Sequence, residues 1–170
     1  MKPVPLAMNP PTTDVTIINT ITLEEAIVLS RQSARKRIIF PYHKKASDKL
    51  HRMLNVIQPG SYIRPHNHAA EGKSESVILL RGGICFMTFD ASGNLISHQD
   101  LIANSLNFGV DIEPNVIHSF FALSEDTVIF EVKPGPYIKE NDKGFASWAP
   151  AENTPEADLY LNDLIVKTGH

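Results

Sequence analysis

Three histidines and one glutamate are the residues of this sequence whose types and spacing could bind a metal ion. His66 and His68 stand two apart in a segment with a strand pattern, Glu75 opens the next apolar run, and His118 comes from a distant segment. Because the side chains of a strand alternate between its two faces, the imidazoles of His66 and His68 project to the same side. Neutral imidazole nitrogens placed in this way can reach one ion at about 2.0–2.2 Å.

The donor types narrow the choice of ion. Three imidazoles and one carboxylate suit divalent Fe, Mn, Ni, Co, Cu or Zn rather than Ca or Mg. Two histidines two residues apart are a weak signal by themselves, because a histidine in a strand is usually a hydrogen-bonded core or surface group. Here glycines frame the motif, since Gly60 lies six residues before His66 and Gly82 lies seven after Glu75. We therefore predict one divalent transition metal ion (Fe, Mn, Ni, Zn or similar) as the cofactor.

Short strands must position these residues. The capping-box pattern that begins at Thr22 predicts a helix from Leu23 to about Arg35. Beyond it, strand-like runs separated by turn residues occur at 52–57, 61–68, 76–80, 84–89, 94–101, 106–112, 116–123 and 127–132. About eight short strands with no strong helix between them predict a mainly β sandwich or closed barrel.

One barrel domain with two extensions is the expected organisation. We predict a flexible N-terminal arm over residues 1–20, a helix and connector over 21–45, and the barrel over 46–137. Residues 138–170 form a C-terminal tail that packs on the barrel, with a short helix near 157–166.

The composition excludes several classes of partner. The chain has 170 residues, of which 42% are apolar and 21% charged, and its formal net charge is −3. This balance offers no basic footprint for nucleic acid and no polybasic patch for a membrane surface. No secretory signal or membrane-spanning run is present, and Cys85 is the only cysteine, so we expect a cytoplasmic protein without an intramolecular disulfide. Its partners are expected to be a small-molecule substrate or ligand and a second copy in a homodimer.

Two stretches resemble the metal-binding motifs of the cupin superfamily. Gly60-Ser-Tyr-Ile-Arg-Pro-His66-Asn-His68, with Glu75 and Gly82, resembles the first motif, and the stretch from Gly109 to His118 resembles the second. This resemblance implies a single double-stranded β-helix (jelly-roll) barrel with an N-terminal helix and an irregular C-terminal tail. It also implies His66, His68, Glu75 and His118 as metal ligands. The loop between the second histidine and the glutamate is longer than usual, and Glu75 is preferred to Glu71 because of its distance from Gly82.

More of the chain resembles one branch, the WbuC family of cupin-fold metalloproteins, over roughly residues 23–160. The similar stretches are Ser33-Ala-Arg-Lys-Arg37, His43, His51-Arg-Met-Leu-Asn55, Tyr62-Ile-Arg-Pro-His66, Glu131-Val-Lys-Pro-Gly-Pro-Tyr137 and Phe145-Ala-Ser-Trp-Ala-Pro150. The chain departs from this family at His51, where a Gln is usual. The family name implies a connection with bacterial surface-polysaccharide biosynthesis.

Further polar residues are predicted beside the metal. Arg64 and Tyr62 lie two and four residues before His66, so a strand would place their side chains on the same inner face. This holds provided that the strand keeps its register through Pro65. An inward Arg64 would orient an anionic substrate, whereas the alternative is a salt bridge at the barrel rim. The predicted substrate-binding residues are Tyr62, Arg64, Arg37 and His43, and the candidate catalytic residues, for proton transfer, are Glu131 and His51.

Three functions compete. The first is a metal-dependent enzyme of the isomerase or oxygenase type that acts on a small polar, sugar-derived substrate of surface-polysaccharide metabolism. The second is a non-catalytic, metal-dependent sugar- or metabolite-binding regulatory protein, because one fold can host unrelated functions. The third is a cofactor-free sugar epimerase, which the complete ligand set disfavours.

Overall fold

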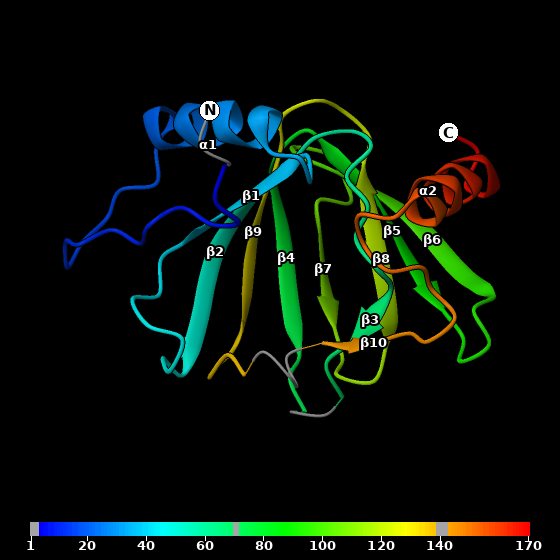
Figure 1. Ribbon diagram of the computed structural model, residues 1–170. Coiled ribbons are helices and arrows are strands. Elements are labelled where there is room, and N and C mark those ends of the chain that lie inside the picture. The colour runs from blue at the N-terminus through cyan, green and yellow to red at the C-terminus, as the bar shows by residue number, and fades with distance from the viewer. Residues whose placement is uncertain (1–3, 70–71, 139–142) are drawn as a thin grey trace.

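Two antiparallel sheets form the body of the protein, which we describe from a computed structural model covering residues 4–69, 72–138 and 143–170. One sheet has the strand order β1-β2-β9-β4-β7 and the other β10-β3-β8-β5-β6 (Figure 1). The elements are α1 (Thr20–Gln32), β1 (Arg37–Pro41), β2 (Leu50–Ile57), β3 (His66–Asn67), β4 (Glu75–Arg81), β5 (Gly83–Phe89), β6 (Leu95–Ile102), β7 (Gly109–Ile112), β8 (Ile117–Ala122), β9 (Thr127–Pro134), β10 (Gly144–Phe145) and α2 (Pro155–Lys167). The two sheets confirm the predicted mainly β jelly roll.

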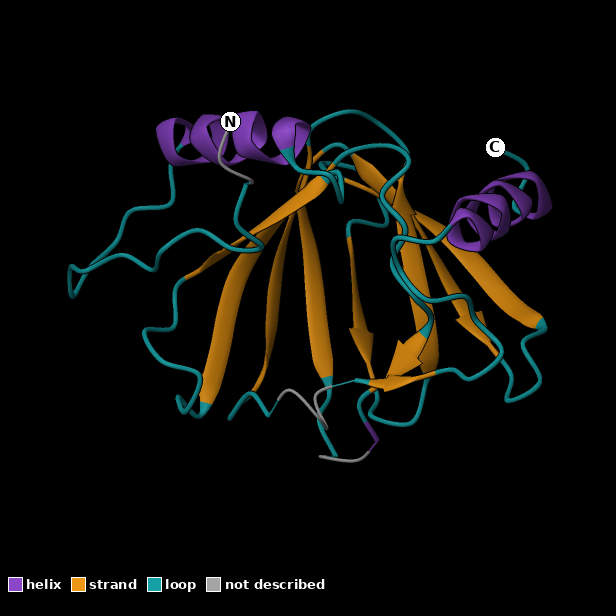
Figure 2. Ribbon diagram, viewed as in Figure 1, coloured by secondary structure: helices purple, strands orange, loops and turns teal. Residues whose placement is uncertain are grey.

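The two helices cover different parts of this barrel (Figure 2). Helix α1 lies along one end and packs on the outer face of β1 and β2, while α2 lies beside β5 and β6. The tail therefore contains a helix longer than the short one predicted near 157–166. No helix in the described parts of the chain is long and apolar enough to span a lipid bilayer.

Helix α1 begins and ends earlier than the sequence pattern indicated. The predicted capping box at Thr22 was wrong, because Asn19 is the N-cap and its side chain accepts a hydrogen bond from the Thr22 backbone N–H at 3.1 Å. Asparagine is among the preferred residues at this position. The chain leaves the helix at Ser33 and enters β1, a strand that lies within the predicted connector.

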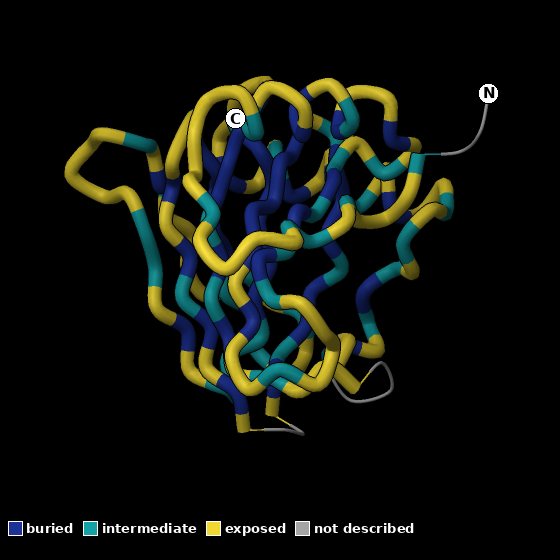
Figure 3. The backbone as a smooth tube through the Cα atoms, turned by 90° about the vertical axis from the view of Figure 1, so that its left-hand side faces the viewer, coloured by how far each residue is buried: buried dark blue, intermediate teal, exposed yellow. Residues whose placement is uncertain are grey.

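The inner face of the barrel changes from apolar to polar along its strands. Along β9 the inward residues run from Ile129 through Glu131 to Lys133, and along β4 they run from Leu79 through Val77 to Glu75. The apolar half contains Ile57, Ile63, Val77, Leu79, Ile84, Phe86, Leu101, Ile112, Phe120, Ala122 and Ile129. Buried backbone follows these strands, and exposed loops lie at their ends (Figure 3). The apolar half holds the sheets together, which leaves the polar half for chemistry.

Helix α1 is tied to the barrel by a hydrogen-bond network around Asp126. This carboxylate accepts hydrogen bonds from the Arg31 guanidinium and from Gln58 Nε2, and the backbone N–H of Asp126 donates to Gln58 Oε1. Asp126 adopts a left-handed conformation, with φ of 58°. Asparagine tolerates this conformation better than alanine does.

We expect Asp126→Ala to lower the free energy of unfolding at pH 7 by about 2 kcal/mol, because Arg31 and the buried Nε2 of Gln58 lose the carboxylate that accepts their hydrogen bonds. Asp126→Asn should cost less, since an amide can still accept from Gln58. The hydrogen bond from Arg31 holds the pKa of Asp126 below its usual value. The stability that depends on the charge of Asp126 is therefore present above about pH 4. It is lost as pH falls through the pKa that Asp126 has in the folded protein, which is lower than its value in the unfolded chain. Urea unfolding of the three proteins at pH 7 and pH 3 measures both effects, and equal stabilities at pH 7 would contradict the assignment.

Candidate metal centre

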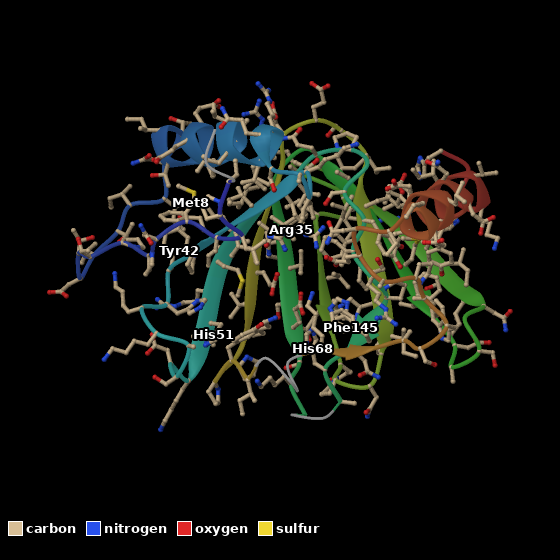
Figure 4. The ribbon with its side chains drawn as sticks, in the orientation of Figure 1. Met8, Arg35, Tyr42, His51, His68 and Phe145 are labelled. Atoms are coloured by element: carbon tan, nitrogen blue, oxygen red, sulfur yellow. The ribbon has the colours of Figure 1, made fainter. Side chains whose placement is uncertain are left out.

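The structure brings together the four residues predicted as metal ligands. His66 in β3 lies directly opposite His118 in β8, His68 follows β3, and Glu75 is the first residue of β4. One ligand atom from each residue lies within 4.8 Å of all the others. All four are buried, with exposed fractions of 2%, 2%, 4% and 0% for His66, His68, Glu75 and His118. Figure 4 shows His68 at the end of the barrel opposite α1.

Backbone carbonyls orient two of the imidazoles. The Nδ1 atom of His66 lies 2.9 Å from the carbonyl oxygen of Arg64, and that of His118 lies 3.0 Å from the carbonyl oxygen of Val116. A carbonyl can only accept, so Nδ1 carries the proton and Nε2 keeps its lone pair. The Nε2 atom of His118 is buried and has no hydrogen-bond partner in the described structure. Such second-shell hydrogen bonds to Nδ1–H are typical of metal-binding histidines.

The electrostatics favour the protonation states that a metal requires. Burial lowers the pKa of His118, and it lowers that of His66 well below the usual value. Both imidazoles are therefore neutral near pH 7. Burial raises the pKa of Glu75, but the His68 hydrogen bond and the charge of Lys133 outweigh it, so that the pKa falls to about 2. The His68 Nε2 and Glu75 Oε2 atoms lie 2.7 Å apart.

These four side chains fit a divalent transition metal. Two oriented imidazole lone pairs, a third imidazole and an ionised carboxylate supply borderline and hard donors. The buried Nε2 of His118 is a polar atom that needs a partner, because a buried acceptor without one is costly. The competing residue Glu71 lies outside the described residues.

Another group of potential ligands is less suited to an ion. Ligand atoms of Cys85, Asp100 and His170 also lie within 4.8 Å of one another. Burial raises the pKa of the Cys85 thiol to about 11, so its sulfur is protonated. The imidazole of His170 is partly exposed and lies 3.2 Å from Asp100. The four-residue cluster is therefore the better candidate for a metal site.

The two candidate catalytic residues line the same polar half of the barrel. Glu131 in β9 accepts a hydrogen bond from Asn55 and forms an ion pair with Lys133, whose ammonium lies 3.3 Å away. Burial and the charge of Glu75 raise the pKa of Glu131. His51 pairs in register with Lys133, and its ring stacks on that of His43 at a centroid distance of 3.9 Å. His43 is the partly exposed member of this stack.

The remaining predicted substrate residues lie elsewhere. Arg37 and Tyr62 line a cleft of about 480 Å³ beside the first turn of α2. There the Arg37 guanidinium donates to the Tyr62 carbonyl oxygen at 2.7 Å and pairs with Glu152. The Tyr62 hydroxyl donates to the carbonyl oxygen of Pro150. Neither side chain belongs to the four-residue cluster.

The Arg64 side chain lies near the four-residue cluster but is not part of it. Its guanidinium lies 5.2 Å from the centroid of the Phe145 ring and donates to the carbonyl oxygen of Ala146. Phe145 pairs with His66, so Arg64 is near the cluster through this ring. The expected strand over 61–68 is reduced to His66–Asn67, because Pro65 lacks the N–H that a sheet ladder requires.

Sequence reasoning missed three polar residues of this region: Asn55, Lys133 and Lys143. Alternation along β9 could have indicated Lys133, two residues after Glu131. Lys143 precedes β10, and only the pairing of β10 with β3 brings it near the histidines. No periodic sequence pattern predicts a strand as short as β10.

Comparisons with known proteins place this fold. The model of a domain of unknown function, DUF6016, matches residues 18–101, and no curated protein sequence matches the chain. The capsular polysaccharide assembling protein CapF from Staphylococcus aureus is 18% identical with a TM-score of 0.52, and the match covers 63% of this chain and 31% of CapF. The chain thus spans about a third of the length of CapF.

Two further solved structures have lower TM-scores. Oxalate decarboxylase from Lactobacillus farciminis is 22% identical (TM-score 0.45, 70% of this chain and 33% of that chain), and KdgF from Halomonas sp. is 13% identical (TM-score 0.43, 54% and 74%). The structural neighbours have the cupin fold. The similarity to CapF, together with the two antiparallel sheets, confirms the predicted cupin fold.

Proposed function

We propose that this protein is a metal-dependent cupin enzyme of the WbuC type. Its substrate is a small polar, sugar-derived molecule of surface-polysaccharide metabolism, and its reaction is of the isomerase or oxygenase type. The observation that carries the proposal is the buried cluster of His66, His68, Glu75 and His118, in which the His118 Nε2 lone pair has no protein partner. The likeness to a capsular polysaccharide assembling protein supports the sugar context.

The cluster would hold the ion, and neighbouring residues would handle protons. When bound, a divalent metal supplies a Lewis acid for a substrate hydroxyl or carbonyl oxygen. Glu131 is the residue placed to take up or release a proton, because its buried carboxyl group has a raised pKa and is oriented by Asn55 and Lys133. His51 in β2 lies directly opposite Lys133, which is two residues after Glu131 in β9.

A screen of metal-loaded protein tests this function. The protein is loaded anaerobically with Fe(II), Mn(II) or Zn(II) and incubated with sugar phosphates and sugar-derived keto acids, and products are followed by NMR. We expect turnover with at least one metal and its loss in Glu131→Gln with the metal retained. Tight binding without product would favour the regulatory alternative. If no metal form binds or converts any of these compounds, the proposal is wrong.

The expected homodimer also belongs to this proposal. Strand β7 is at the edge of its sheet, and exposed apolar side chains gather beside it, including Ile78, Leu80 and Phe108. A second copy of the chain would cover them. Light scattering measures the molar mass, and a monomer at micromolar concentration would contradict the dimer.

A further inference from the structure

Lys143 places an ammonium group beside the metal-binding histidines. It precedes β10, in which Phe145 lies opposite His66. A single residue, Gly144, therefore separates Lys143 from the Phe145–His66 pair. The electrostatics agree with this placement, since the charge of Lys143 lowers the pKa of both His66 and His118.

The charges of Glu75 and Glu131 act on this ammonium and raise the pKa of Lys143, but neither carboxylate forms an ion pair with it. Lys143 is only partly buried and has neither a hydrogen bond nor an ion pair with a described residue. The other buried lysines of the region differ, because Lys73 donates to the carbonyl oxygen of Pro136 at 2.6 Å and Lys133 pairs with Glu131.

A second positive charge stands close to the first. Burial and then the charge of Lys133 lower the pKa of Lys143. Two ammonium groups and two imidazoles therefore face one region, and a divalent metal would add further positive charge. Placing like charges together in partly desolvated surroundings costs free energy unless a counter-charge is bound. Among the described residues, the charges of Glu75 and Glu131 balance those of Lys133 and Lys143, so that a bound divalent metal would leave an excess of positive charge.

We propose that Lys143, together with Lys133, binds the anionic group of the substrate, a carboxylate or a phosphate, next to the metal ligands. This inference rests on the proposed function, because the anion belongs to the molecule that the metal would contact. It narrows the substrate class from small polar molecules to sugar acids or sugar phosphates. Lys143 is a substrate-positioning residue, and the ligand set of the metal does not include it.

Anion titration of a charge-deleted variant tests the proposal. Lys143→Met keeps the length of the side chain and removes its charge, and Lys167→Met, on the exposed face of α2, is the matched control. Glycolate and inorganic phosphate are titrated by calorimetry into the Zn(II)-loaded and metal-free forms of each protein. Metal content is measured in parallel by mass spectrometry.

We expect one of the two anions to bind the parent protein and Lys143→Met to weaken that binding by about 10-fold or more. Lys167→Met should bind like the parent protein. Glycolate binding would indicate sugar acids, and phosphate binding would indicate sugar phosphates. Lys143→Met should melt at no lower temperature than the parent protein, because it loses no hydrogen bond or ion pair to a described residue.

The proposal is overturned if Lys143→Met binds both anions as tightly as the parent protein, or if neither anion binds the parent protein in either form. These failures are distinct from failure of the proposed function. Loss of metal binding by the parent protein would count against the metal site, whereas the anion titration of the metal-free form would still report on Lys143.

Discussion

His118→Ala is expected to weaken binding of a divalent transition metal by more than about 100-fold. Substitution of groups that only orient metal ligands typically costs 10–100-fold, so loss of a ligand should cost more. The Nε2 atom of His118 is buried, unpaired and oriented by the Val116 carbonyl oxygen, so no neighbouring group of the described structure replaces it. Competition with a chromophoric chelator measures the affinity.

The control for this variant is His98→Ala, which removes an exposed imidazole on β6. It should leave metal affinity unchanged. Parent-like affinity in His118→Ala would show that the cluster around His66 does not hold the ion.

Removal of the metal is expected to lower the unfolding free energy by about 4 kcal/mol when the free metal concentration is about 1,000 times its dissociation constant. The proposed ligands belong to β3 and the residue after it, to β4 and to β8, and these segments come together only in the folded chain. Removing it leaves the His118 lone pair buried without a partner. Thermal unfolding with and without a chelator measures the effect.

The double variant His66→Ala/His118→Ala provides the reference for this experiment. Its melting temperature should not respond to the chelator, because it has no site to empty. A chelator that leaves the melting temperature of the parent protein unchanged would contradict metal binding by the folded protein.

The sequence predicted the barrel because its short apolar runs are separated by turn residues. In Thr127–Pro134, for instance, Glu131 is recognisable as a charged residue in an otherwise apolar run. Strand β1 was missed because Arg35, Lys36 and Arg37 suggested the end of a helix. The left-handed residue Lys36, with φ of 55°, separates the two elements, and sequence periodicity does not reveal such a conformation.

The four-residue cluster could be predicted from the spacing of its residues, because His66 and His68 share a side and the motif spacing selects Glu75. The residues around the cluster were harder to predict. The parity argument for Tyr62 assumed a continuous strand through Pro65, but the chain is not a strand there, and Tyr62 packs with α2. Lys143 directly precedes the two-residue strand β10, and no local sequence pattern predicts the long-range pairing of β10 with β3.

A crystallographic anomalous difference map would locate a bound metal ion in the folded protein. It is recorded at the absorption edge of whichever metal elemental analysis finds in the untagged protein. We expect one strong peak, about 2.0–2.2 Å from the Nε2 atoms of His66, His68 and His118 and from a carboxylate oxygen of Glu75. A protein that is free of metal after supplementation with Fe, Mn, Ni and Zn, or a peak elsewhere in the molecule, would contradict this expectation.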